Sequence, residues 1–304
     1  MPKLSPYELD HFHREGYLVG KNIVPPSYIY ELQAELTQLV DATARTLHRY
    51  GYITNLCEDL DFLHRLTELH KQANAIVSPI LNHGSFAGPA MFRLLTCPEL
   101  LDVVEQLVGP EIEASSVYRI RPKLPFRPEG VVPWHQDQGY FHSMADDKLV
   151  VTCWLPLMNA TVETGCMEVI PRSHRQGVVR HYWANNPAPP LTIHPDHLPW
   201  TTPVPVPADI GDVVLMTNLT MHRSTENTSG LIRWAADLRY ESPDVGDFYP
   251  YEAAFIARSR KHPEQVLTDP FQFNELRTKH VPKGTLDRTW LYEDNETFIN
   301  QPKK

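Results

Sequence analysis

The sequence predicts a mainly β protein with flanking helices, built on an antiparallel sandwich or barrel. Helical patterns occupy the first part of the chain, and from about residue 111 short β-rich segments separated by turns or proline replace them. No long helical pattern lies between these segments, which disfavours parallel βαβ units. A length of 304 residues suits one such domain.

The N-terminal part begins with a helix signature. Ser5 and Glu8 form a capping box with proline at the first helical position, and Gly16 ends the pattern before a short strand over residues 17–19. A longer helix is expected from Ser27 to about Tyr50, because leucine and isoleucine recur there at helical spacing. Two further helices are expected over residues 59–80 and 98–107.

The second part contains the expected strands, over residues 115–120, 149–157, 167–170, 212–217 and 232–240. Eight prolines and no glycine lie between Pro187 and Pro207, which predicts a stiff segment. It either covers the mouth of a barrel or is a surface excursion without a role. Helical patches follow at 263–267 and 271–276. We therefore expect one domain over residues 1–304, with a helical scaffold (1–110), a β core (111–242) carrying a Pro-rich loop (184–208), and a C-terminal extension (243–304).

Charge and processing signals narrow the function classes. The formal charge of −9 disfavours a nucleic acid or an anionic membrane as partner. No apolar run approaches the roughly 20 residues of a membrane helix, and the N-terminus lacks the apolar stretch of a signal peptide. The four cysteines are far apart, which is typical of free thiols. We expect a cytoplasmic protein with a small-molecule partner, and the oligomeric state is not readable from the sequence.

One constellation points to metal chemistry. His135 and Asp137 are two residues apart in a β-rich segment, so both side chains can point to the same face. His222 follows a later strand and can supply a third ligand. Two histidines and one carboxylate form the facial triad of non-heme Fe(II) oxygenases, which leaves coordination positions open. The similar pairs at 194–196 and 262–264 lack a strand that would fix their geometry.

A cation and a hydroxyl follow the third ligand. Arg233 lies eleven residues after His222 on the next β segment, and its guanidinium could pair with the far carboxylate of a chelating keto acid. Ser224 could add a hydroxyl to the same carboxylate. The order of these residues is more specific than any one of them alone.

The ordered series resembles the phytanoyl-CoA dioxygenase family of Fe(II)/2-oxoglutarate-dependent oxygenases. The matching pieces are Trp-His-Gln-Asp at 134–137, Cys-Trp-Leu-Pro-Leu at 153–157, Glu-Thr-Gly-Cys-Met-Glu-Val-Ile-Pro-Arg-Ser-His at 163–174, Gly-Asp-Val-Val at 211–214 and His-Arg-Ser at 222–224 through Arg233. The resemblance covers roughly residues 5–242 and implies a double-stranded β-helix, a cupin-like jelly roll. It implies iron on His135, Asp137 and His222.

The same resemblance implies the co-substrates and their contacts. Arg233 would anchor 2-oxoglutarate with support from Ser224, while Trp154 and Val117 are looser matches to co-substrate contacts. O₂ would be the second co-substrate, and the product side would release succinate and CO₂. Tyr140, His142 and Arg239 are candidate substrate residues, Arg239 through an anionic group of the substrate or, alternatively, in an ion pair with Asp237 or Glu241. No catalytic residue beyond the metal ligands is expected.

The expected reaction is hydroxylation of an unactivated C–H bond in a small organic substrate. Because the chain keeps Asp137, where halogenating relatives have a small residue, halogenation is disfavoured. Desaturation, cyclisation or epimerisation at the same site remains an alternative, and so does a non-catalytic metal-binding jelly roll. The acidic chain offers few basic residues near the motif, which ranks coenzyme A esters below free small molecules.

Overall fold

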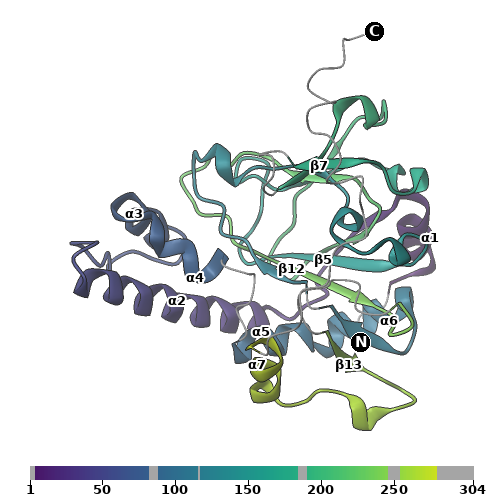
Figure 1. Ribbon diagram of the computed structural model, residues 1–304, viewed down its shortest axis with the longest axis horizontal. Coiled ribbons are helices and arrows are strands. Elements are labelled where there is room, and N and C mark those ends of the chain that lie inside the picture. The colour runs from purple at the N-terminus through teal and green to yellow at the C-terminus, as the bar shows by residue number, and fades with distance from the viewer. Residues whose placement is uncertain (1–3, 82–87, 116, 184–189, 246–253, 279–304) are drawn as a thin grey trace.

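A large antiparallel sheet forms the centre of the protein, with helices on one face and smaller sheets on the other (Figure 1). The structure is a computed structural model that describes residues 4–81, 88–115, 117–183, 190–245 and 254–278. Among these residues no helix is long and apolar enough to cross a membrane.

The strands form three antiparallel sheets. The seven-stranded sheet has the order β1-β10-β5-β12-β2-β13, with β3 also paired to β12; the second sheet has the order β4-β11-β6-β9, and β7 pairs with β8. This arrangement confirms the mainly β prediction and is consistent with a jelly-roll core. The strands are β1 (Tyr17–Gly20), β2 (Ile112–Ala114), β3 (Arg119–Ile120), β4 (Val132–His135), β5 (Val150–Pro156), β6 (Met167–Val169), β7 (His181–Trp183), β8 (Leu191–Ile193), β9 (Val204–Val206), β10 (Val213–Thr217), β11 (His222–Ser224), β12 (Ala235–Glu241) and β13 (Phe255–Arg258).

The helices pack against one another and against the large sheet. They are α1 (Pro6–Glu15), α2 (Pro26–Arg49), α3 (Arg65–Gln72), α4 (Ser78–Leu81), α5 (Pro89–Leu95), α6 (Pro98–Val108) and α7 (Pro270–Thr278). Of these, α1, α4 and α6 contact the large sheet directly. The predicted capping box is present at Ser5, and Gly16 ends α1 in the left-handed conformation. The second helix begins at Pro26 rather than Ser27, because Pro25 is its N-cap residue.

The secondary structure differs from the sequence prediction in three places. The single helix expected over 59–80 is broken into turns, α3, a 3-10 turn and α4, since Ala73 is extended and interrupts the helical backbone. Helix α5 has no counterpart in the sequence prediction. Of the strand expected over 115–120, only Arg119–Ile120 is assigned as a strand, β3, and β2 lies just before the expected range.

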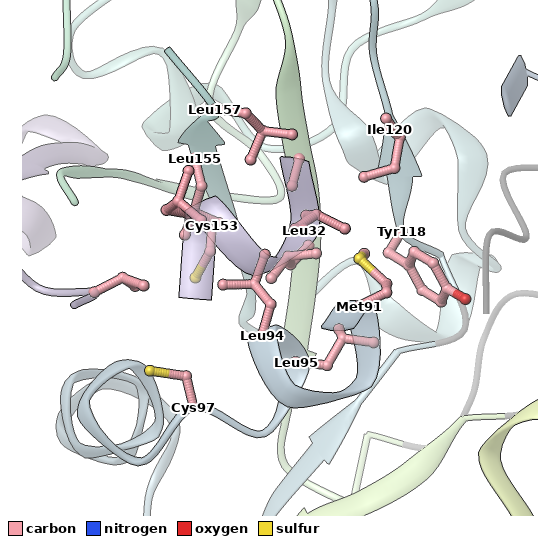
Figure 2. Close-up of a cluster of buried hydrophobic side chains, with 14 of the residues drawn as sticks. Leu32, Met91, Leu94, Leu95, Cys97, Tyr118, Ile120, Cys153, Leu155 and Leu157 are labelled. Atoms are coloured by element: carbon pink, nitrogen blue, oxygen red, sulfur yellow. The ribbon is translucent and has the colours of Figure 1, made fainter. Parts of the chain in front are cut away.

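Side chains that alternate along the central strands point in turn to the helical core and to the interior of the jelly roll. On β5, Cys153 and Leu155 face the helices, where Figure 2 shows them with Leu32 and Leu94 in a buried apolar cluster. Trp154 points to the opposite face and belongs to a second cluster. Because successive residues of a strand point to opposite faces, the same strand that anchors the helices also presents side chains to the interior of the jelly roll.

The Pro-rich segment is more regular than expected. Its described part contains β8, a 3-10 turn at Pro195–His197 and β9. Strand β9 pairs with β6, and β7 with β8 forms a hairpin whose Leu191 amide donates to the hydroxyl of Tyr140. The segment therefore contributes two strands, one to the smaller sheet and one to the hairpin.

Candidate metal and co-substrate site

Two strands of the smaller sheet bring the candidate histidine ligands together. In the antiparallel pairing of β4 with β11, His135 lies directly opposite His222, and their ring centroids are 4.2 Å apart. Each ring places Nδ1 at a main-chain carbonyl, of Pro133 at 2.8 Å and of Thr220 at 2.9 Å. These contacts fix Nδ1 as the protonated nitrogen and leave both Nε2 atoms able to bind a metal.

Asp137 completes the group just after β4 ends. The strand stops at His135, and Asp137 is the first residue of a 3-10 turn at Asp137–Tyr140. The intervening Gln136 is extended, so the carboxylate still points to the side of His135. Its Oδ1 lies 3.8 Å from Nε2 of His135 and 3.9 Å from Nε2 of His222. The three side chains are buried, and their ligand atoms all lie within 4.8 Å of one another.

The charge states of this group suit a divalent cation. Burial and the neighbouring His222 hold the pKa of His135 well below its usual value, so its imidazole is neutral and can ligate. Burial opposes ionisation of Asp137, but the Arg239 guanidinium outweighs it and holds the pKa of that carboxyl well below the ordinary range. Two imidazoles and one carboxylate are the donor set of a mononuclear Fe(II) site.

Arg239 occupies a different place from the one that the sequence suggests. Its guanidinium is buried and bidentate to Asp137, with Nη2 donating to Oδ1 at 2.7 Å and Nε to Oδ2 at 3.0 Å. Nη1 donates to the carbonyl of Val117, and Asp237 is a second acidic neighbour at 3.2 Å. The ion-pair alternative is therefore the one observed, with the partner Asp137 in addition to Asp237. The guanidinium is engaged rather than open to a substrate.

A cavity of about 250 Å³ opens beside the three candidate ligands. His135 and His222 form part of its wall, together with three of the residues expected to contact the co-substrate, Trp154, Ser224 and Arg233. The remaining lining residues are Arg121, Pro122, Lys123, Gly130, Val132, Met167, Met216 and Asp237.

In this cavity the guanidinium of Arg233 has N–H donors that bind no described residue. Its Nε and Nη1 are buried and have no hydrogen-bond partner among the described residues. The guanidinium lies over the Trp154 ring, 5.4 Å from the centroid, and burial together with the charge of Arg121 lowers the pKa of Arg233 to about 10. A buried guanidinium with two free donors fits a carboxylate, so the residues present suit both a divalent metal and a 2-oxoglutarate molecule.

Lys123 is a cavity residue whose place near Arg233 the sequence did not reveal. Its Nζ donates to Ser224 Oγ at 2.8 Å and to the carbonyl of Thr225. Burial and the neighbouring Arg233 lower the pKa of Lys123 to about 6. Ser224 thus holds Lys123 rather than Arg233 directly. The local sequence gives no sign of this, because Lys123 pairs with Arg233 through an isolated antiparallel bridge between residues far apart in the chain.

The other candidate residues, Tyr140, His142 and Val117, are not among the residues that line the cavity. Tyr140 packs edge-on against His135, with ring centroids 6.1 Å apart, and burial raises the pKa of its hydroxyl. The carbonyl of His142 accepts a hydrogen bond from Gln138. Val117 does not line the cavity, because its side chain packs in a separate buried cluster and its carbonyl binds Arg239. The pair His194 and Asp196 is outside the metal group, as expected.

Comparison with known proteins supports the resemblance. The phytanoyl-CoA dioxygenase family model matches residues 12–235. The peroxisomal phytanoyl-CoA dioxygenase of Homo sapiens is 24% identical over 238 residues, covering 77% of this chain and 67% of the human protein. The phytanoyl-CoA dioxygenase domain-containing protein 1 of Bos taurus is 25% identical over 264 residues, covering 77% of this chain and 89% of the bovine one.

Solved structures support the fold. An apo non-heme monooxygenase, ThoJ, is similar with a TM-score of 0.53 at 19% identity, covering 85% of each chain. The α-ketoglutarate-dependent carbocyclase SnoK from nogalamycin biosynthesis has a TM-score of 0.52 at 18% identity, covering 88% of this chain and 95% of SnoK. The cupin-type jelly roll that the resemblance implied is thereby confirmed. The chain belongs to the phytanoyl-CoA dioxygenase family and is an Fe(II)/2-oxoglutarate-dependent dioxygenase.

Proposed function

We propose that this protein hydroxylates an unactivated C–H bond of a small organic substrate while 2-oxoglutarate is converted to succinate and CO₂. In this proposal His135, Asp137 and His222 hold the iron and Arg233 holds the distal carboxylate of 2-oxoglutarate. The observation that carries it is the pair of unpartnered buried donors on Arg233, in the same cavity as the ligand cluster.

The residues of the chain would divide the work as follows. The bound iron, with 2-oxoglutarate and O₂, supplies the oxidising power that breaks the C–H bond. Arg233 orients the co-substrate, and Trp154 forms an apolar wall beside the guanidinium. Lys123, next to Ser224, places a second basic group near Arg233. Met167 and Met216 exclude water from the same cavity, where both side chains are buried.

An anaerobic titration tests the proposal. The protein is loaded with Fe(II), and 2-oxoglutarate is added while the visible spectrum is recorded. Chelation of the metal by the keto acid is expected to give a weak visible charge-transfer band in the wild type and none in His135→Ala or Asp137→Ala. The proposal is abandoned if the wild type gives no band, and a non-catalytic metal-binding jelly roll then becomes the better account.

The outcome of the reaction and its cellular location need separate tests. Mass spectrometry of products distinguishes hydroxylation, a gain of one oxygen, from desaturation, cyclisation or epimerisation. The cytoplasmic location is a prediction, and the human relative is described as peroxisomal. Microscopy of the tagged protein in its own cells would decide between the two compartments.

A further inference from the structure

Residues 119–123 place basic side chains along one wall of the cavity. This segment runs antiparallel to β12: Lys123 is the cross-strand partner of Arg233, and main-chain hydrogen bonds join Arg121 to Ala235 in both directions. Cross-strand partners point to the same face of a sheet. Arg121 and Lys123 therefore share the interior face with Arg233, and all three line the cavity.

Of these three basic side chains, Arg121 is the one whose guanidinium is open to solvent and can still bind an anion. Lys123 is held by Ser224, and Arg233 is fully enclosed, whereas the side chain of Arg121 is 44% exposed. Its acidic neighbour in the cavity, Asp237, is 3.7 Å away, beyond hydrogen-bond length. That carboxylate also faces Arg239 at 3.2 Å, so two guanidinium groups share one acid.

The local charge is opposite to that of the chain. The protein carries −9, yet the charged residues lining the cavity, apart from the metal ligands, are three bases and one acid. The charges of a divalent metal ion and the 2-oxoglutarate dianion cancel one another, and so do those of the Asp137 carboxylate and its partner Arg239. Loading the site with both therefore leaves the wall positive, and it stays positive even if Lys123 is uncharged. A local potential of this sign attracts anions and favours their entry.

We propose that Arg121 binds an oxyanion of the primary substrate, a carboxylate or a phosphate, and so selects acidic small molecules. The inference rests on the proposed function and adds the substrate class to it. Arg121 is placed to do this because it lines the same cavity as Arg233 and the candidate ligands His135 and His222. An anion held there shares the cavity with the co-substrate anchor and the two histidine ligands. The same chemistry restores coenzyme A esters, through their phosphates, to the candidate substrates.

Matched pairs of small probes test the inference without knowledge of the natural substrate. The full-length protein is loaded with Zn(II) and 2-oxoglutarate, and the affinities of phenylacetate against phenylacetamide, and of phenyl phosphate against phenol, are measured by calorimetry. We expect at least one anion to bind about tenfold or more tightly than its neutral partner. The two pairs distinguish a carboxylate from a phosphate preference.

Two variants assign the preference to Arg121. Arg121→Gln should lose it and Arg121→Lys should keep part of it, because the lysine retains the charge but not the bidentate donors. Arg127→Gln is the matched control, since it removes the same charge from an exposed residue shortly after this segment that does not line the cavity. If neutral and anionic probes bind wild type equally, if no anion binds, or if Arg127→Gln loses the preference as well, the inference is overturned.

The anaerobic Fe(II) titration on the same preparations separates the two proposals. A charge-transfer band together with no anion preference overturns only the role of Arg121. Absence of the band in the wild type overturns the proposed function itself. Circular dichroism of each variant establishes that it is folded, and the Arg121→Lys variant keeps the test decisive if Arg121→Gln does not fold.

Discussion

The carboxylate of Asp137 is held by Arg239 so that its two oxygens have different surroundings. Oδ2 accepts from both Nε of Arg239 and the hydroxyl of Thr152. Within the described part of the chain, Oδ1 accepts only from Nη2 of Arg239, and it faces the two histidine Nε2 atoms. One oxygen is saturated by donors and the other retains a lone pair toward the metal position. The arrangement favours a carboxylate that binds through one oxygen, which preserves open coordination positions.

Arg239→Met should therefore weaken metal binding. Partners that orient a metal ligand are worth roughly 10- to 100-fold in affinity, and we expect a loss in that range for Ni(II) binding measured by calorimetry. Thr152→Val should lose less, because Arg239 still holds both oxygens. Arg258→Met is the control: it breaks a comparable ion pair, with Asp102 and Glu105, far from the cavity. Equal Ni(II) affinity in Arg239→Met and Arg258→Met would contradict this role.

Arg233 should determine the affinity for 2-oxoglutarate without affecting the metal. Arg233→Met removes a buried, charge-assisted contact, which typically costs about 2–5 kcal/mol of binding free energy. We expect 2-oxoglutarate binding to the Ni(II)-loaded protein to fall accordingly while Ni(II) affinity stays at the wild-type value. Arg223→Met is the control, because Arg223 is next to His222 in sequence but pairs outward with Glu168. A parallel loss of Ni(II) affinity in Arg233→Met would argue that the residue supports the fold rather than the co-substrate.

The metal group was predictable because its signal is local. His135 and Asp137 are two residues apart, and the later His222 and Arg233 follow at spacings that match a known family. The two residues are not on one strand as the sequence suggested, because β4 ends at His135. The extended backbone of Gln136 nevertheless keeps the side chain of Asp137 on the same side as that of His135. Fold class was predictable for a similar reason: strand segments with turns between them are visible one at a time.

The supporting residues were not predictable because their signal is the pairing of distant strands. Lys123 reaches the site through its register with Arg233, and Arg239 through contact with a residue 102 positions away. Nothing in the local sequence distinguishes Arg239 facing a substrate from Arg239 facing Asp137. Likewise, the break at Ala73 depends on an extended backbone that helical periodicity over 59–80 does not show.

Gly165 should be required for two reasons: its backbone is in the left-handed conformation, and there is no room for a side chain at this position. Its φ is +79°, and a Cβ there would lie 2.7 Å from the carbonyl oxygen of Thr225 and 3.0 Å from Cδ of Lys123. Gly165→Ala should therefore cost more than the approximately 1–2 kcal/mol of left-handed strain, and should also weaken 2-oxoglutarate binding by moving Lys123. Gly51→Ala supplies the strain alone, since Gly51 has φ of +75° and nothing within 4 Å of a Cβ. Urea unfolding should show a larger loss in the free energy of unfolding for Gly165→Ala than for Gly51→Ala. Equal losses would mean that Thr225 and Lys123 move aside without an energetic cost.

Lys123 should make stability depend on pH. Its pKa is about 6 in the folded protein against 10.5 for an ordinary lysine, so between these values the unfolded chain binds a proton that the folded chain does not. The free energy of unfolding then rises with pH, by up to about 1.4 kcal/mol per pH unit from this group. This slope becomes smaller as pH falls toward 6, where the folded protein also binds the proton. Lys123→Met should show a flatter dependence between neutral and alkaline pH, whereas Lys148→Met, at an exposed position, should keep the wild-type slope. Identical slopes in all three proteins would show that the Lys123 ammonium is retained on folding.

The same lysine should couple 2-oxoglutarate binding to proton uptake. The co-substrate brings negative charge to Arg233, next to Lys123, and a nearby anion favours the charged form of an amine. At pH values above 6, where the free protein has Lys123 largely neutral, binding should therefore take up as much as one proton, and affinity should fall as pH rises. Calorimetry of the Ni(II)-loaded protein in buffers of different ionisation enthalpy measures this uptake directly. Lys123→Met should abolish it, and an unchanged uptake in that variant would assign the proton to another group.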